Sequence, residues 1–237
     1  MVKMDNLSEN NIKVQSDDTA KYNSLFRDPQ HFIDRENFHL QFLTDLIDKN
    51  ISVNENTAIM EVGFGDGERL KRISAHYSNA KIIGVEVRKN CVDDLASQGY
   101  DCRLVTEELF KVDEVLDVIY GYNILHHISI PYDYLQHLYS MLKPGGILVF
   151  PYEAYITCLW TYIITTIYGN WKYEMNVFKF SKGKLKKNCK KFAANFYVGY
   201  NGLLCLPGFP RLNKFYRFFR FHKLPFINEL MLFVKKD

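Results

Sequence analysis

Residues 61–67 read EVGFGDG, so an acid at Glu61 is followed by glycines at every second position from Gly63 to Gly67. Because glycine has no Cβ, backbone amides in such a turn can approach a bound ligand closely. Folds that bind a diphosphate use G-x-G-x-x-G, and P-loops end in Lys followed by Ser or Thr. This stretch has neither pattern, so it predicts a binding site for a nucleoside without phosphates.

A second acid, Glu86, ends the apolar run over residues 81–85, about twenty residues after the glycine turn. In dinucleotide-binding folds, a carboxylate at the tip of the second strand accepts hydrogen bonds from both hydroxyls of a ribose. The spacing therefore predicts that Glu86 holds a ribose beside the glycine turn.

Strands and helices must bring these residues to one edge of a sheet. The expected order is a strand over 57–60, a helix from 69, a strand over 81–85, a strand from 116 that runs into a polar loop, a helix ending over 138–142, a turn at Lys143-Pro144-Gly145-Gly146, and a strand from Ile147. Alternating strands and helices are typical of a parallel sheet with crossover helices, which binds ligands at its strand ends.

These motifs resemble the class I S-adenosylmethionine-dependent methyltransferase family over about residues 57–152. The resemblance implies an α/β fold with a Rossmann-like, seven-stranded, mostly parallel sheet flanked by helices. It also implies S-adenosyl-L-methionine as the cofactor and S-adenosyl-L-homocysteine as the product.

The resemblance assigns cofactor-binding roles residue by residue. Glu61 and the glycines match the motif beside the methionine part, Glu86 matches the ribose-binding acid, and Asn123 matches the loop that faces the reacting methyl group. Where an acid or amide is expected to meet the adenine, the choice falls on Glu107. The expected cofactor-binding residues are Glu61, Gly63, Phe64, Gly65, Gly67, Glu86, Val87, Glu107 and Asn123.

Methyl transfer is an in-line displacement in which the cofactor supplies the reactivity and the protein supplies position and charge. An oxygen nucleophile benefits from a base, and the histidine pKa lies near neutrality. His126 and His127 follow the strand at the methyl side, and the resemblance gives one of them that role. Glu153 is a further candidate base, as are Tyr152 and Tyr155.

Some acceptors are disfavoured by what the motifs lack. The loop over residues 123–126 reads NILH, without the Asn/Asp-Pro-Pro-Tyr of enzymes that methylate exocyclic amines, and no catalytic-cysteine motif for pyrimidines is present. An oxygen on a small, glycan-like or lipid-linked acceptor is the expected target. Two alternatives are an RNA methyltransferase that uses a basic C-terminal third, and a cofactor-binding family member without catalysis.

Composition is typical of one globular domain. The 237 residues suit a single domain with an ample core. Five scattered cysteines form no metal-binding or disulfide pattern, so we expect no metal, reduced thiols and a cytoplasmic protein. The first eleven residues lack an apolar signal core.

Charge is divided unevenly along the chain. Residues 1–150 contain 15 Lys/Arg and 23 Asp/Glu, whereas residues 151–237 contain 15 and 4. Such asymmetry indicates an acidic partner for the C-terminal third: a membrane surface, a phosphorylated substrate or nucleic acid. Among these partners, nucleic acid is disfavoured because no separate RNA-binding module is recognisable.

The predicted organisation is a flexible N-terminus over 1–19 and a methyltransferase domain over 20–237, with its cofactor-binding core over 57–152 and a substrate cover over 153–225. From Asp34 a helical period runs through Phe38, Phe42 and Leu46, with Ile33 and Leu43 on neighbouring positions, and Tyr22 or Phe32 could close over the cofactor.

The C-terminal third adds several expected elements. Residues 154–168 form an uncharged run too short and too polar to span a membrane. Ser181 can cap a lysine-rich helix that extends through Phe192, and a last strand is expected over 229–234. Arg211–Lys223 mixes cations with aromatic residues, which suits either peripheral contact with the inner face of a membrane or a cover over the substrate.

Overall fold

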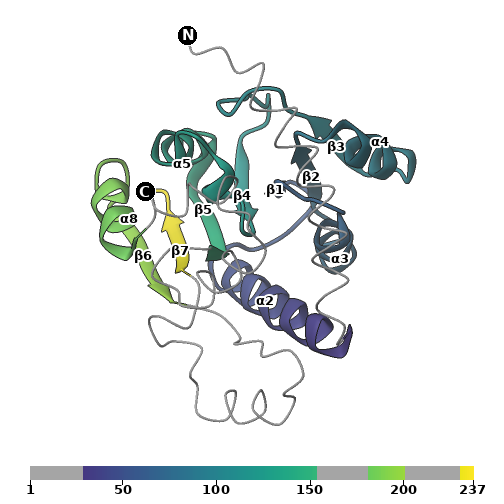
Figure 1. Cartoon of the computed structure of the whole chain (residues 1–237), viewed down its shortest axis with the longest axis horizontal. Helices are drawn as coiled ribbons and strands as arrows, with labels where there is room; N and C mark the ends of the chain where they lie inside the picture. The colour runs from purple at the N-terminus through teal and green to yellow at the C-terminus, as the bar shows by residue number, and fades with distance from the viewer. Residues whose placement is uncertain (1–28, 154–180, 201–229) are drawn as a thin grey trace, which may run out of the picture.

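The computed structural model describes residues 29–153, 181–200 and 230–237, in which helices cover both faces of one sheet (Figure 1). The sheet has seven strands in the order β3-β2-β1-β4-β5-β7-β6. All pairings are parallel except those that β7 makes with β5 and β6. The strands are β1 (Ala58–Val62), β2 (Lys81–Glu86), β3 (Asp101–Leu104), β4 (Leu116–Gly121), β5 (Leu142–Glu153), β6 (Asn195–Tyr200) and β7 (Leu230–Lys235). This sheet confirms the predicted Rossmann-like fold.

Helices flank the sheet and pack against it to form the hydrophobic cores. They are α2 (Pro29–Asn50), α3 (Glu68–His76), α4 (Lys89–Ser97), α5 (Pro131–Ser140), α8 (Lys182–Cys189) and a short 3₁₀ helix, η1 (Leu125–His127). Ile59 packs in the core with α2 and α3, whereas Met60 packs in the core with α5 and α8. Because successive residues of a strand point to opposite faces, these cores lie on opposite sides of the sheet. Strands buried on both faces explain the near-continuous apolar runs in the sequence.

The predicted turn at residues 143–146 is wrong, because this segment belongs to β5. Leu116 and Val118 of β4 pair with Leu142 and Ile147, so β5 carries extra residues at this point. Gly145 adopts a φ of 79°. Its N–H donates to the Lys236 carbonyl. The residue after β7 therefore forms hydrogen bonds with the irregular segment of β5, so this segment pairs as a strand and does not form the predicted turn.

The N-terminal helix is confirmed, but its buried face differs from the predicted one. The helix begins at Pro29 rather than Asp34. Its buried face carries His39, Leu43 and Ile47, of which only Leu43 was predicted, whereas Phe38, Phe42 and Leu46 are half-buried. A hydrophobic period cannot reveal this face, because a histidine and a glutamate occupy its buried positions near the site.

In the C-terminal third, the structure describes α8, β6 and β7. The Ser181 hydroxyl accepts a hydrogen bond from the Lys184 N–H, which confirms the predicted cap. The helix ends at Cys189, short of Phe192. The last strand is also confirmed. Within the described ranges, no helix is long and apolar enough to cross a membrane.

Several predicted features lie outside the described residues. These are the segments 1–19, 154–168 and Arg211–Lys223, most of the cover over 153–225, and the side chains of Tyr22, Phe32 and Tyr155.

Candidate functional site

The glycine turn joins β1 to α3 at the carboxyl edge of the parallel strands. A Cβ on Gly63 would lie 2.7 Å from Ile124 Cδ1, and one on Gly67 would lie 2.2 Å from Leu95 Cδ2. These two glycines therefore serve packing within the protein. The nearest atom to a Cβ on Gly65 is Arg88 Nη2 at 3.4 Å, so Gly65 offers the most open backbone of the turn to a ligand.

Glu86 is fixed beside this open position at the end of β2. Its Oε2 accepts a hydrogen bond from the Gly65 N–H at 2.9 Å, and its Oε1 accepts from the N–H groups of Val87 at 2.9 Å and Arg88 at 3.2 Å. The Arg88 guanidinium adds a longer contact of 3.4 Å to Oε2. The predicted glycine turn and ribose-binding acid are thus joined directly. Of these contacts, the long one to Arg88 is the easiest for a ribose hydroxyl to replace.

Glu61 lies beneath the turn and is completely buried. Tyr120 donates its hydroxyl proton to Glu61 Oε2 at 3.0 Å, while Arg69 Nε lies 3.6 Å from Oε1. Burial raises the pKa of Glu61 to about 7, and the positive charge of Arg69 opposes this rise. Oε1 has no hydrogen-bond partner among the described residues. A buried acceptor of this kind favours a cationic donor as its partner.

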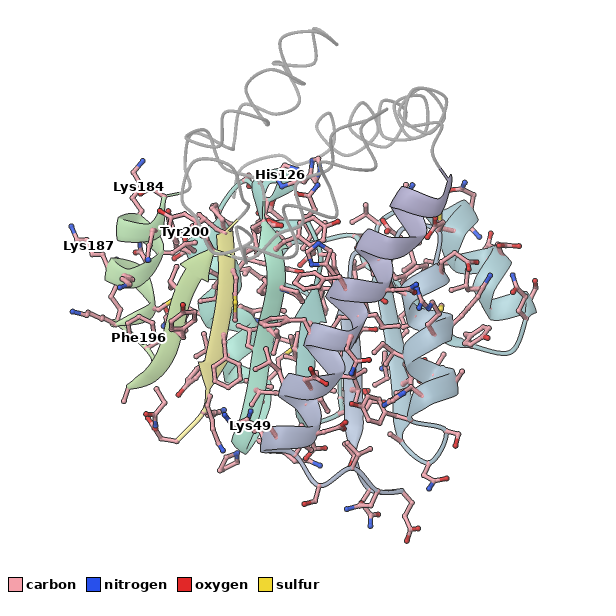
Figure 2. The ribbon with its side chains drawn as sticks, turned by 90° about the horizontal axis from the view of Figure 1, so that it is seen from below. Lys49, His126, Lys184, Lys187, Phe196 and Tyr200 are labelled. Atoms are coloured by element: carbon pink, nitrogen blue, oxygen red, sulfur yellow. The ribbon has the colours of Figure 1, made fainter. Side chains whose placement is uncertain are left out.

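Sequence reasoning missed Arg69 and its second partner, Glu36. Arg69 on α3 donates to Glu36 Oε2 of α2 at 2.9 Å, and its guanidinium lies 4.5 Å from the centre of the Tyr122 ring. Two carboxylates therefore surround one guanidinium, which leaves the cluster one positive charge short when both acids are ionised. No sequence signal links Glu36 to Arg69, because their contact depends on how α2 crosses the sheet (Figure 2).

The predicted histidines lie on η1, directly after β4. Glu153, at the end of β5, accepts a hydrogen bond from the Leu125 N–H at 2.8 Å, and its Oε2 lies 3.5 Å from His126 Nδ1. His126 and Glu153 are almost fully buried. Burial raises the pKa of Glu153. Glu153 therefore anchors the histidine loop, and its predicted role as a base stays a prediction.

His127 is the more exposed of the two histidines. Its ring centre lies 3.9 Å from that of His126, and the residue is half-buried. Burial, the neighbouring His126 and the charge of Arg88 lower the pKa of His127 well below its ordinary value. Its imidazole is therefore neutral at neutral pH, which is the form that a general base needs.

Asn123 connects β4 to η1 in a left-handed conformation with φ of 52°, which asparagine tolerates better than most residues. Its N–H donates to the Tyr152 carbonyl at 3.2 Å, so the loop is tied to β5. Figure 2 shows His126 at the end of the sheet opposite Lys49, which lies near the end of α2. This is the carboxyl edge, where the glycine turn and Glu86 also lie.

The remaining predicted residues differ in their placement. The Phe64 side chain packs with Leu70 in the core, so only its backbone can meet a ligand. Val87 is 44% exposed beside Glu86, and Glu107 is exposed after β3. Its neighbour Glu108 instead accepts hydrogen bonds from the N–H and hydroxyl of Ser129, at 2.6 and 2.7 Å. Glu108 therefore joins the loop after β3 to the histidine loop.

Comparison with known proteins identifies the domain that carries this edge. Residues 60–148 match a family described as a methyltransferase domain. The chain therefore resembles methyltransferase domains over these residues. The match confirms the resemblance to S-adenosylmethionine-dependent enzymes that the motifs predicted, and it spans the glycine turn, Glu86 and both histidines of the methyltransferase.

Solved structures support the methyltransferase fold. The CurJ carbon methyltransferase aligns with a TM-score of 0.59 and 16% identity, over 92% of this chain and 57% of that one. The plantazolicin methyltransferase BpumL, in complex with SAH and a pentazolic substrate analog, aligns at 0.58 and 13% identity, over 98% and 97%. Geranyl diphosphate C-methyltransferase from Streptomyces coelicolor A3(2) aligns at 0.56 and 10% identity, over 83% and 77%.

The extent of these matches limits what they show for the methyltransferase. The chain spans less than two thirds of the CurJ chain but nearly all of BpumL. At such identities the structures establish the fold alone. No curated protein matches the sequence.

Proposed function

We propose that the protein transfers a methyl group from S-adenosylmethionine to an oxygen atom of a small, glycan-like or lipid-linked acceptor. S-adenosylhomocysteine is the product. The main observation behind this proposal is the arrangement at the carboxyl edge. There the Gly65 N–H donates to Glu86, and His127 is held neutral by burial and by the positive charge of Arg88, which lower its pKa.

The buried acid Glu61 supports the choice of cofactor. Its Oε1 lacks a hydrogen-bond partner among the described residues, and the cluster with Glu36 and Arg69 is one positive charge short. Glu61 would hold the α-ammonium of the methionine part, which would supply that charge. Glu86 would hold the ribose, Val87 and Glu107 would lie on the adenine side, and the bound cofactor would supply an electrophilic methyl group.

His127 is the proposed base. A neutral imidazole can take the hydroxyl proton of the acceptor as the oxygen attacks, so the proton moves from the acceptor to the ring. Glu153 and His126 act by position, since Glu153 accepts the Leu125 N–H and thereby holds η1 in place. Asn123 sets where the loop leaves β4.

The aligned structures support the class of acceptor. They include a geranyl diphosphate C-methyltransferase and a plantazolicin methyltransferase, which favours a small acceptor here as well. We propose that the segment over 153–225 covers this acceptor. We also propose that the protein works in the cytoplasm, with Arg211–Lys223 contacting the inner face of a membrane.

Mass spectrometry tests this function. Small molecules and lipids from cells with and without the protein should differ by one species that gains a methylene mass, and a labelled methyl group should appear on oxygen. Label on carbon or nitrogen would refute O-methylation while leaving methyl transfer intact. Cofactor binding by calorimetry without transfer to any cell fraction would favour a non-catalytic protein.

A further inference from the structure

Residues 181–200, which form α8, the turn after it and β6, make up a basic surface. This segment has six lysines and no acid: Lys182, Lys184, Lys186, Lys187, Lys190 and Lys191. The absence of acids extends from residue 175 to residue 228. Figure 2 shows Lys184 and Lys187 projecting outward from α8.

Packing fixes which side of α8 faces outward. Leu185 and Cys189, one helical turn apart, are buried against the sheet. All the lysines of the basic surface except Lys182 are exposed. The apolar side of the helix is therefore already used by the fold, and the lysines form a surface held on a rigid support.

The lysines repel one another along this helix. Lys186 and Lys190 are four residues apart across the end of α8, and Lys187 and Lys191 have the same spacing into the turn after it; like charges this close repel one another. Within the described ranges none of these four lysines forms an ion pair with an acid. Solubility alone would be served equally well by alternating charges, so the pattern indicates an external anionic partner.

Aromatic residues of β6 border the lysines. Phe196 and Tyr200 of this edge strand pack against the same core as α8, whereas Tyr197 between them points to the opposite face of the sheet. The ammonium of Lys182 lies 4.7 Å from the centre of the Tyr200 ring. Because β6 runs parallel to β5, Tyr200 lies at the same edge of the sheet as the candidate site. Figure 2 shows Tyr200 and His126 toward the same end of the molecule.

We propose that the basic surface docks the protein on a membrane that contains anionic lipid. Clusters of four to eight basic residues on a helix are typical of such contacts, each adding attraction near the surface. All six cations are lysines, whereas reading of bases and paired contacts to phosphates favour arginine. This inference deepens the proposed function, since it rests on a lipid-linked acceptor and brings the site to it.

Vesicle flotation tests the docking surface. The full chain should float with phosphatidylcholine vesicles in which a third of the lipid is phosphatidylglycerol, but not with phosphatidylcholine alone, and added salt should release it. The triple variant Lys187→Ala, Lys190→Ala, Lys191→Ala should bind the anionic vesicles on the order of a hundredfold more weakly.

A matched triple variant distinguishes the effect of where the lysines lie from the effect of the net charge of the protein. Lys71→Ala, Lys81→Ala, Lys89→Ala removes the same charge from the region of α3, β2 and α4, and it should bind vesicles within about twofold of the wild type. Equal losses in both triple variants would overturn the proposal. Tighter binding to a single-stranded oligoribonucleotide than to vesicles, lost in the α8 variant, would assign the surface to nucleic acid instead.

Cofactor binding, measured on the same samples, distinguishes failure of the docking proposal from failure of the proposed function. Protein that binds S-adenosylhomocysteine but ignores anionic vesicles at low ionic strength would refute the docking surface and leave the proposed function standing. Protein that floats with vesicles but never binds S-adenosylhomocysteine would refute the proposed function and retain the surface.

Discussion

Charged side chains are arranged in opposite ways at the carboxyl edge and on the basic surface. At the edge, Glu61, Glu86 and Glu153 are each at most 5% exposed, and each accepts hydrogen bonds from identified donors. On the basic surface, exposed lysines follow one another without an acid. The edge is organised by the protein itself, whereas the surface needs an external anion to offset its charge.

This difference predicts how each region responds to change. Preorganised groups act at short range, so single substitutions at the edge should have large effects that salt barely alters. Exposed lysines act through a screened potential, so each contributes little and salt removes the effect.

His127→Ala should have the largest effect. Loss of a general base lowers turnover by about 10² to 10⁴-fold. Cofactor affinity should stay within about twofold, because we propose that His127 contacts the acceptor and not the cofactor. Single-turnover kinetics together with calorimetry measure both quantities. A wild-type rate in this variant would remove His127 from the mechanism.

Gly65→Arg should weaken cofactor binding by about a hundredfold or more, because the new side chain fills the most open position of the turn. Gly67→Ala is the matched control: its Cβ would meet Leu95, so it should instead lower the free energy of unfolding by about 2–4 kcal/mol. Calorimetry and thermal unfolding separate the two outcomes. Unchanged cofactor affinity in Gly65→Arg would contradict the site.

The pKa of Glu61 predicts a pH dependence. With a pKa of about 7 in the folded protein, raised from 4.5, the acid is mostly protonated at pH 6 and mostly ionised at pH 8. An ionised Glu61 attracts the α-ammonium, so the affinity for S-adenosylhomocysteine should rise about tenfold over this range. Titrations at several pH values measure it. Glu61→Gln should bind more weakly, without this rise.

The raised pKa of Glu61 also predicts that the stability of the fold falls as the pH rises, whereas cofactor affinity increases. The folded state holds the proton more tightly than the unfolded state, so the contribution of Glu61 is present below pH 4.5 and is lost as the pH rises through 7. The loss is about 3 kcal/mol. Chemical denaturation of the wild type and Glu61→Gln should therefore diverge in pH dependence, and parallel curves would argue against a raised pKa.

Lys186→Glu should have the smallest effect of these substitutions, and it should stabilise the fold rather than destabilise it. It places an acid four residues before Lys190, a favourable orientation that stabilises a helix by about 0.2–0.5 kcal/mol. The free energy of unfolding should rise slightly while vesicle binding falls. A loss of both would indicate that Lys186 has a packing role that the exposed position does not suggest.

Local motifs predicted the parts of the site that lie close together in sequence. The glycine turn, Glu86 and the histidine loop each follow a strand, and the parallel sheet brings strand ends to one edge. The roles of Arg69 and Glu153 could not be predicted, because each depends on a contact between elements far apart in the chain. The segment 143–146 was missed for a related reason: pairing with β7 overrides its local preference for a turn.

The order of strands in the sheet also constrains biosynthesis. β6 precedes β7 in the chain, yet β7 lies between β6 and β5 in the sheet. Until β7 has been synthesised, β6 has no strand to pair with, and the edge of β5 that will pair with β7 is exposed. Chaperones that shield open strand edges should therefore associate with this polypeptide until β7 has been delivered.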